Sequence, residues 1–448
     1  MNKIKKYAPI IILFIGIVSG LFWGTKYHNY GQLIKDEAEY DTLARNILSY
    51  HTFGYSAAEP TMQREPGYPA FLVIIYYIFG HKPLVVLFFQ ILLFTATAFI
   101  IYRIGALLLN GTIGLLAGIL SALFPTTASF VGYMGTETLF TFLFVLWIYI
   151  FAKAIKYNKW YQYFLAGIIF GLAVLTRTII LYILPFIIFI PFIIYRHKFK
   201  QAMLVAMLFL VACFLIITPW AIRNKYDFNT YSLRGNGGWL LWIRTETVNL
   251  SFREYGQYIS TAIFGDYITQ KICPDFSGDF RSLTYLPSKD RINELAVLKY
   301  TRDESDAIMM NEAKLNILSH PFLYGLGSIA ELFKLQTPMN PQFQTFHMFV
   351  ETNQNMPSTI KIFIILFIRT LYLLFFSSVF YGIYKAFRAG GIIAVIGLAA
   401  VLFELVYTLV DTIPRYLLPD WPLYFIFFIH GLSFMFPRQY KTMQLILE

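Results

Sequence analysis

Long apolar runs alternate with short polar connections along most of the chain. Ten of these runs are candidates for helices that cross the apolar core of a bilayer, which takes about 20 residues. The run at 67–80 is also apolar, but it is shorter and contains Pro69. We predict ten spans, at residues 7–23, 83–109, 113–131, 139–154, 161–175, 179–194, 202–220, 360–384, 392–410 and 416–436.

The composition agrees with a membrane location. Of the 448 residues, 57% are hydrophobic and only 14% are charged, whereas a soluble domain carries more charge. We therefore predict an all-α, polytopic membrane protein. The two cysteines, Cys213 in an apolar run and Cys273 in a polar segment, do not indicate a disulfide framework.

The distribution of charge decides how the run at 67–80 is treated. If this run does not cross, one side of the membrane receives 14 basic residues and a single acid, Glu448. Basic loops face the cytoplasm in most membrane proteins, so we predict cytoplasmic termini and a re-entrant or surface-lying helix at 67–80 on the outer side. The net charge of +11 is then a signal of topology and requires no nucleic acid partner.

This topology divides the chain into three parts. Residues 1–220 form an N-terminal membrane module, with a first outer loop at 25–82. Residues 221–359 form an extracytoplasmic segment with an amphipathic helix at 304–317 and a membrane-lying stretch at 321–333. Residues 360–448 supply the C-terminal spans.

The first outer loop contains the strongest candidate for chemistry, Asp36 with Glu37. The spacing of apolar residues after them predicts a short amphipathic helix on the membrane surface, with its apolar face down. In a structural interpretation, Asp36 and Glu39 cap that helix. In a functional one, Asp36 is a general base at an interface where partial desolvation raises its proton affinity.

Further charged residues are predicted to lie at the same membrane face. Arg64 precedes the rigid turn Pro66-Gly67-Tyr68-Pro69, at the height of lipid phosphates, where its paired N–H donors suit a phosphate. Other members of this group are Glu137, Arg177, Arg223 and Arg415. Each of them is alternatively a snorkelling or paired charge, and Arg177 has Glu137 as a candidate partner. The seven histidines show no metal-ligand spacing, and a metal site remains unknown.

Six short motifs follow one another along the chain: Asp36-Glu37-Ala38-Glu39-Tyr40, Arg64-Glu65-Pro66-Gly67-Tyr68-Pro69, Glu137-Thr138-Leu139-Phe140, Leu175-Thr176-Arg177, Pro219-Trp220-Ala221-Ile222-Arg223-Asn224 and Arg415-Tyr416-Leu417-Leu418-Pro419. In order and spacing this series resembles the GT-C membrane glycosyltransferases, which use polyprenyl-phosphate-linked sugars. The group includes protein O-mannosyltransferases and the aminoarabinose transferases of lipid A.

The resemblance implies a GT-C-like bundle of about ten spans with interfacial helices. It implies that Asp36 is the catalytic base and that Arg64 contacts the lipid phosphate. The donor would be a polyprenyl-phosphate sugar, and the acceptor a hydroxyl or phosphate of a cell-envelope glycolipid, polysaccharide or protein. Transfer would be inverting, at the extracytoplasmic side of the plasma (inner) membrane, with a divalent metal as the one cofactor to consider. The substrate-binding residues would be Glu37, Arg64, Glu137, Arg177, Arg223, Arg415 and Tyr416.

Two other classes of protein are alternatives. A transporter or flippase for lipid-linked sugars typically has internal repeats and ionisable residues near mid-membrane. Here no repeat is visible and most candidate charges are predicted at one face, which favours an enzyme. The second alternative is a non-catalytic scaffold or inactive relative.

Overall fold

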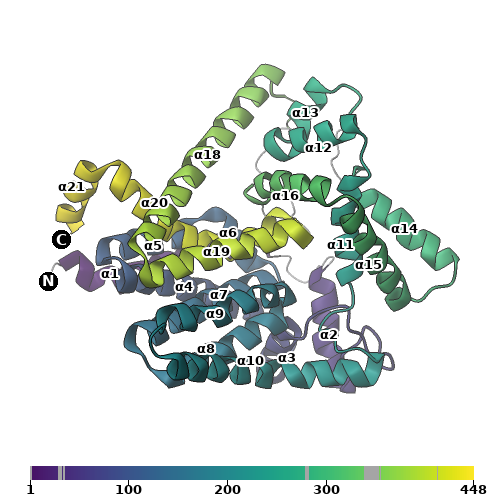
Figure 1. The fold of residues 1–448 in the computed structure, drawn as a ribbon, viewed down its shortest axis with the longest axis horizontal. Coiled ribbons are helices and arrows are strands. Elements are labelled where there is room, and N and C mark those ends of the chain that lie inside the picture. Colours follow the sequence, from purple (N-terminus) through teal and green to yellow (C-terminus); the bar gives the residue numbers. More distant parts are fainter. Residues whose placement is uncertain are drawn as a thin grey trace. The chain divides into compact units, whose positions relative to one another are not determined.

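The computed structural model describes residues 3–28, 33, 36–277, 282–337, 353, 355–410 and 412–447. All regular secondary structure in these residues is helical (Figure 1). The chain forms two compact units. Unit 1 consists of Met1–Leu233, Phe375–Phe403 and Leu418–Glu448, and unit 2 of Arg234–Leu374 and Glu404–Leu417.

Unit 1 contains most of the apolar helices. In chain order they are α1 (Lys3–Tyr27), α2 (Asp36–Tyr50), α3 (Gly67–Phe79), α4 (Pro83–Leu108), α5 (Gly111–Leu123), α6 (Pro125–Ser129), η1 (Phe130–Gly132), α7 (Thr136–Tyr157), α8 (Trp160–Thr176), η2 (Thr178–Ile183), α9 (Leu184–Ile194), α10 (Phe199–Phe228), α20 (Trp421–Met435) and α21 (Pro437–Leu447). Two long helices, α18 (Ser358–Ala389) and α19 (Gly391–Val410), contribute to both units.

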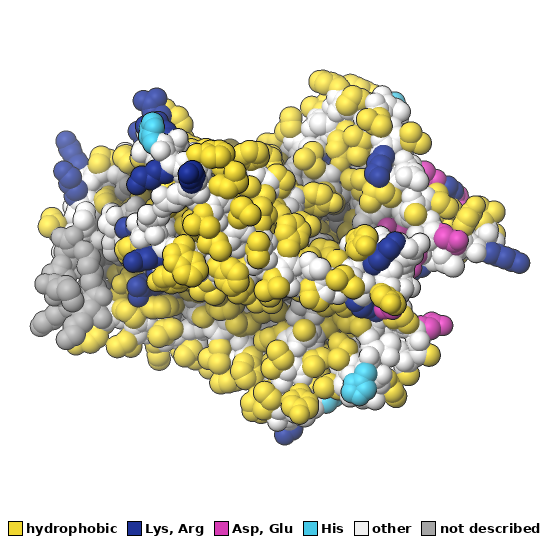
Figure 2. All heavy atoms as spheres, turned by 60° about the horizontal axis from the view of Figure 1, so that its bottom comes forward, with side chains coloured by type: hydrophobic (Ala, Val, Ile, Leu, Met, Phe, Trp, Pro, Cys, Tyr) yellow, Lys and Arg dark blue, Asp and Glu magenta, His cyan; other side chains and the backbone are white. Residues whose placement is uncertain are grey.

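The helices confirm the predicted class of polytopic all-α membrane protein. In the described part of the chain, six helices are long and apolar enough to cross a membrane. Helix α5 and the following α6–η1 make a seventh if the pair, bent by 47°, is one span. The predicted spans at 161–175, 179–194 and 416–436 correspond to shorter apolar helices. Hydrophobic side chains cover much of the surface in Figure 2, as expected for a surface that faces lipid.

Close helix contacts in unit 1 depend on glycines. A Cβ atom on Gly105 of α4 would lie 2.6 Å from the Cα atom of Gly114 in α5. A Cβ atom on Gly167 of α8 would lie 2.3 Å from the carbonyl oxygen of Phe209 in α10. Small residues let the backbones of membrane helices approach in this way, and α8 and α10 pack side by side.

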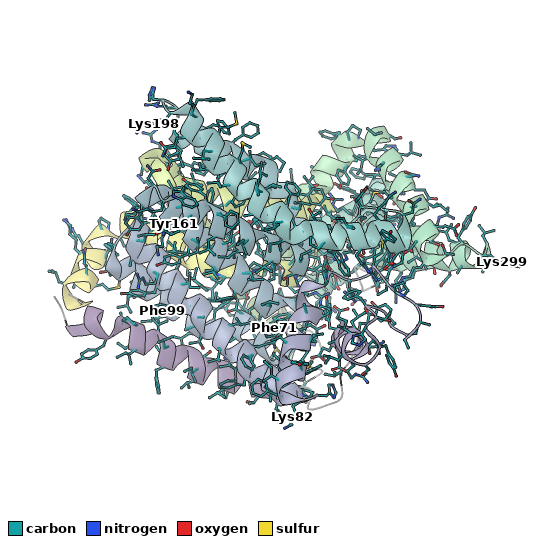
Figure 3. The ribbon with its side chains drawn as sticks, turned by 90° about the horizontal axis from the view of Figure 1, so that it is seen from below. Phe71, Lys82, Phe99, Tyr161, Lys198 and Lys299 are labelled. Atoms are coloured by element: carbon teal, nitrogen blue, oxygen red, sulfur yellow. The ribbon has the colours of Figure 1, made fainter. Side chains whose placement is uncertain are left out.

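Helix α3 is too short to cross a bilayer, with 13 residues. In Figure 3, Phe71 of α3 and Lys82 lie toward one end of unit 1, whereas Tyr161 and Lys198 lie toward the other end. The exposed side chains of Ile74, Tyr77 and Ile78 are apolar or aromatic. That residues 67–80 stay at the outer membrane face remains a prediction, to be tested by the labelling experiment given in the Discussion.

Unit 2 consists of shorter helices and contains the predicted amphipathic segment. Its elements are α11 (Gly237–Thr245), η3 (Glu246–Val248), α12 (Phe252–Phe264), α13 (Asp266–Ile272), α14 (Tyr285–Val297), α15 (Arg302–Ser319), α16 (Pro321–Leu335) and η5 (Pro414–Leu417), with parts of α18 and α19. The expected helix at 304–317 lies within α15, which a Thr301–Glu304 capping box begins. The stretch at 321–333 lies within α16.

Candidate active site

Helix α2 begins at Asp36, and Arg64 binds two carboxylates of its first turn. The Arg64 Nη2 atom lies 2.6 Å from Asp36 Oδ1, and the Arg64 Nε atom lies 2.8 Å from Glu39 Oε2. Residues three apart on a helix are neighbours, so one planar guanidinium can contact both. The structure thus brings together the predicted base and the predicted phosphate ligand, in direct contact.

The environment of Arg64 keeps its guanidinium charged. Burial alone would lower the pKa of Arg64, but interactions with Tyr40, Asp36 and Glu39 outweigh burial and raise it above its usual value. The guanidinium also lies 5.3 Å from the centroid of the Tyr40 ring. The Tyr55 hydroxyl donates a hydrogen bond to Glu39, and burial raises the pKa of Tyr55, so this donor keeps its proton.

Part of α2 faces the interior of unit 1, and the predicted orientation of this helix needs a correction. Leu43 and Ala44 are buried as expected, but the carboxylates of Glu37 and Asp41 are buried as well. Burial is tolerated because both acids have hydrogen-bond donors. The backbone N–H of Met134 donates to Glu37 over 3.0 Å.

Asp41 has three partners on α2 and around α3. Its Oδ1 atom accepts a hydrogen bond of 2.8 Å from the Tyr76 hydroxyl and lies 2.7 Å from His81 Nε2. Its Oδ2 atom pairs with Arg45 at 2.8 Å. The contacts with Tyr76 and His81 hold α2 against the C-terminal end of α3 and the residues that follow it.

A second ion pair joins the ends of α7 and α8. Arg177 Nη2 lies 2.5 Å from Glu137 Oε1, and Arg177 Nε donates to Thr136 Oγ1 over 2.8 Å. Both charged side chains are nearly buried, with 10% and 3% exposure. The predicted alternative, in which Arg177 pairs with Glu137, is therefore observed in the structure.

The two ion pairs belong to one connected cluster. Glu65, the neighbour of Arg64, accepts hydrogen bonds from the backbone N–H and the hydroxyl of Thr178, the neighbour of Arg177. Gly67 makes this approach close, because a Cβ atom there would lie 2.7 Å from the carbonyl oxygen of Leu175.

A series of side-chain contacts through Tyr40, Tyr68 and Gln90 connects the same cluster to α4. The rings of Tyr40 and Tyr68 meet edge to face, with their centroids 5.2 Å apart. The Tyr68 hydroxyl donates to Gln90 Oε1 over 2.8 Å. Gln90 Nε2 in turn donates to the carbonyls of Val131 and Tyr133. A buried amide in α4 thereby positions both α3 and the loop that carries Met134.

The other predicted residues are placed differently. The guanidinium of Arg223 donates to the carbonyl oxygens of Thr61 and Phe53 and pairs with Asp227 at 2.8 Å, so it holds the loop before Arg64. Arg415 and Tyr416 belong to unit 2. There the Tyr416 ring stacks on the Tyr407 ring at 4.9 Å, and the Arg415 guanidinium lies 5.7 Å from the Tyr416 ring.

The sequence interpretation missed three acidic residues of this site. Glu39 carried a signal, because it stands three residues after Asp36 on a predicted helix. Glu65 and Asp41 carried none, because their partners lie far away along the chain. Within the described part of the chain, no group of three or more His, Cys, Asp or Glu side chains is arranged to hold a metal ion.

Comparisons with known proteins bear on this cluster. Residues 60–222, which include Arg64, Glu137 and Arg177, match the family described as dolichyl-phosphate-mannose-protein mannosyltransferase. No sequence among the curated proteins matches the chain significantly.

Solved structures resemble the whole chain. The apo form of the oligosaccharyltransferase of Archaeoglobus fulgidus has a TM-score of 0.53 at 14% identity, over 100% of this chain and 53% of that one. The oligosaccharyltransferase AglB of the same organism, in complex with an inhibitory peptide and a dolichol-phosphate, has a TM-score of 0.50 at 13% identity, over 99% of this chain and 52% of that one. ArnT from Cupriavidus metallidurans in the apo state has a TM-score of 0.39 at 13% identity, over 95% and 76%.

The chain spans about half the length of the archaeal structures that it matches. At these identities the likeness concerns the fold, and the family match adds sequence similarity over residues 60–222. Together they confirm the resemblance that the six motifs indicate: in its fold and in the sequence of residues 60–222, the chain is similar to the GT-C membrane glycosyltransferases.

Proposed function

We propose that this protein is an integral membrane glycosyltransferase that moves a sugar from a polyprenyl-phosphate carrier to a hydroxyl or phosphate of a cell-envelope acceptor. The observation that carries the proposal is the contact of Arg64 with Asp36 and Glu39 at the start of α2. It joins a carboxylate that can accept a proton to a cation that suits a phosphate. Arg64 also lies within the matched family segment.

The proposed reaction is a single displacement. The acceptor oxygen forms a bond to the anomeric carbon of the sugar, and the bond from that carbon to the phosphate oxygen breaks. The electron pair stays on the leaving phosphate, and the acceptor proton moves to the carboxylate of Asp36. Arg64, whose charge is permanent, stabilises the negative charge that grows on the phosphate. A displacement of this kind inverts the anomeric centre.

The remaining residues have supporting roles in this proposal. Glu37 and Glu65 hold the backbone around Asp36 and Arg64. Arg223 holds the loop that leads to Arg64. The buried pair of Glu137 and Arg177 fixes the ends of α7 and α8 behind Arg64.

The archaeal relative supports the choice of donor class, since one of its structures contains a dolichol-phosphate. Another of its structures contains Zn and sulfate. In this chain, Asp36 and Glu39 share Arg64, and the described residues offer no cluster of metal ligands, so no step is assigned to a metal. Assaying transfer with EDTA, and then with Mg²⁺, Mn²⁺ or Zn²⁺ restored, tests this assignment directly.

The decisive experiment replaces Asp36 and uses Glu39 as the matched control. Asp36→Asn and Glu39→Gln each remove one charge and one ion-pair partner of Arg64. If Asp36 is the base, Asp36→Asn lowers the transfer rate by roughly 10²–10⁴-fold, whereas Glu39→Gln has a much smaller effect. Asn is a good helix cap, so the Asn variant should remain folded. Equal losses in both variants would show that the carboxylates only position Arg64.

Transfer activity in detergent separates the enzyme from a flippase. A transferase releases polyprenyl phosphate and glycosylates an acceptor in detergent micelles. A flippase moves lipid from one leaflet of a bilayer to the other, and a micelle has no leaflets. A panel of polyprenyl-phosphate sugars given to the purified protein should yield such release with at least one donor. Activity that needs a sealed bilayer, with no transfer in micelles, would favour the flippase.

A further inference from the structure

An open pocket of about 730 Å³ lies in unit 1, away from the candidate active site. The last turns of α4, the last turns of α7 and the first turn of α8 form its walls. Its volume is in the range of sites for small ligands. The lining side chains that matter here are Tyr102, Arg103, Tyr149, Lys153, Lys159 and Gln162.

The pocket gathers positive charge from three separate elements. Arg103 comes from α4, Lys153 from α7, and Lys159 from the junction with α8. Among the described residues none of these three forms a salt bridge; Arg103 and Lys153 instead lie over the rings of Phe99 and Tyr149, at 6.0 and 5.4 Å.

None of the side chains that line the pocket in the described part of the chain is acidic. Between Glu65 and Asp227 the sequence contains one acid, Glu137, and this carboxylate is paired with Arg177. Figure 2 shows Lys and Arg side chains gathered at the left end of the view, where no Asp or Glu side chain is visible. An anion is therefore the kind of ligand that this pocket suits.

A buried amide provides a second, independent observation. Gln162 is 8% exposed, its Oε1 atom is fully buried, and its side chain makes no hydrogen bond to any described residue. A buried polar group without a partner is costly, because it loses its hydrogen bonds to water. The buried Oε1 atom is itself an acceptor, so an anion does not satisfy it. The Nε2 group of the same amide also has no hydrogen-bond partner among the described residues, and it is the donor that this pocket offers to an oxyanion.

We propose that this pocket binds the phosphate headgroup of an anionic phospholipid. Arg103, Lys153 and Lys159 would contact the phosphate oxygens, and Gln162 would donate a further hydrogen bond at the base of the pocket. A lipid is favoured over a free anion because aromatic side chains border the opening. Tyr157, Trp160 and Tyr161 are at least half exposed, as is typical of residues at the membrane interface. The proposal is independent of the transferase activity.

Native mass spectrometry of the purified full-length protein tests the proposal. The probe is phosphatidylglycerol, titrated into a detergent that strips loosely bound lipid. We expect one retained phosphatidylglycerol, and roughly tenfold or greater weakening in the Arg103→Gln/Lys153→Gln variant. The matched control, Lys198→Gln/Lys200→Gln, also removes two charges in the basic part of unit 1 but lies outside the pocket, and it should retain the lipid.

A second variant separates the pocket from a general attraction between charges. Gln162→Leu leaves the charge unchanged and removes the buried amide, so it should weaken retention of the lipid without lowering the unfolding temperature. Equal weakening in the pocket and control variants would overturn the proposal. Displacement of the lipid by equimolar inorganic phosphate would overturn the choice of a lipid. Preferential retention of polyprenyl phosphate would likewise identify a different ligand.

Discussion

The buried pair of Glu137 and Arg177 gives the sharpest prediction about stability. In Glu137→Gln the shape of the side chain is kept and its charge is lost, so the Arg177 guanidinium remains buried without this carboxylate. At the observed separation of 2.5 Å the Coulomb energy is about 7 kcal/mol for an effective dielectric constant of 20. Part of this Coulomb energy offsets the cost of removing the two charges from water. Breaking a buried ion pair by replacing one partner typically costs about 3–5 kcal/mol of stability.

Thermal unfolding in detergent, followed by tryptophan fluorescence, measures this effect. For a chain of 448 residues, a loss of that size corresponds to a fall in unfolding temperature of roughly 3–5 °C. Glu59→Gln is the matched control, because Glu59 is an exposed loop carboxylate and its replacement should change stability by at most about 0.5 kcal/mol. Arg177→Gln alone should also destabilise the protein. The double variant Glu137→Gln/Arg177→Gln should recover part of the loss, because neither charge is then left buried.

Two outcomes would refute the reasoning. If Glu137→Gln unfolded at the wild-type temperature but bound the polyprenyl-phosphate donor more weakly, Glu137 would contact the substrate and the ion pair would not be its main role. Additive effects in the double variant would also contradict a direct interaction.

Three further predictions concern the backbone, the loop and the topology. Gly67→Ala should destabilise the protein by about 1–3 kcal/mol and reduce sugar transfer, because the new Cβ atom would lie 2.6–2.7 Å from atoms of α8. Chemical denaturation should show the lower stability, and an unchanged unfolding midpoint would contradict this prediction. Arg223→Lys cannot reproduce the two guanidinium donors, one to the carbonyl of Thr61 and one to the carbonyl of Phe53. Limited proteolysis should therefore cut the loop that contains these two residues faster than in wild type, and equal rates would argue against this role. Cysteines replacing Lys82 and Lys198 should react differently with an impermeant thiol reagent in intact cells, the first labelled and the second protected; equal labelling would overturn the predicted topology.

The periodicity of the sequence identifies most helices, but it does not identify their partners. Apolar runs fix the positions of the long helices, since burial in lipid requires about 20 apolar residues wherever a helix crosses. Asp36 and Glu37 of the first outer loop are also identifiable from the sequence, because they stand out against apolar surroundings. The bond from Met134 to Glu37 joins residues 97 positions apart, and only the packed structure shows that a carboxylate there is buried.

Arg64 and Arg223 illustrate the same limit. Both are predicted at the membrane face, Arg64 as the contact of a lipid phosphate and Arg223 as a substrate-binding residue. In the structure Arg64 contacts two carboxylates, whereas Arg223 contacts two backbone carbonyls and the carboxylate of Asp227. Charge and topology place a cation at a surface, but the partners of that cation depend on the conformation of the neighbouring loop.

The discontinuous composition of unit 1 has a consequence for the order of synthesis. Leu233 ends its first stretch, and its last stretch begins at Leu418, so about 185 residues are made between them. At roughly 5–20 residues per second, this interval lasts about 10–40 s. During that time Phe124, the residue after α5, lacks its contacts with Trp421 and Phe425 of α20, whose ring centroids lie 4.6 and 5.3 Å from its own in the finished structure. Until α20 is made, lipid or a membrane chaperone must therefore cover the surface of the N-terminal helices against which α20 later packs.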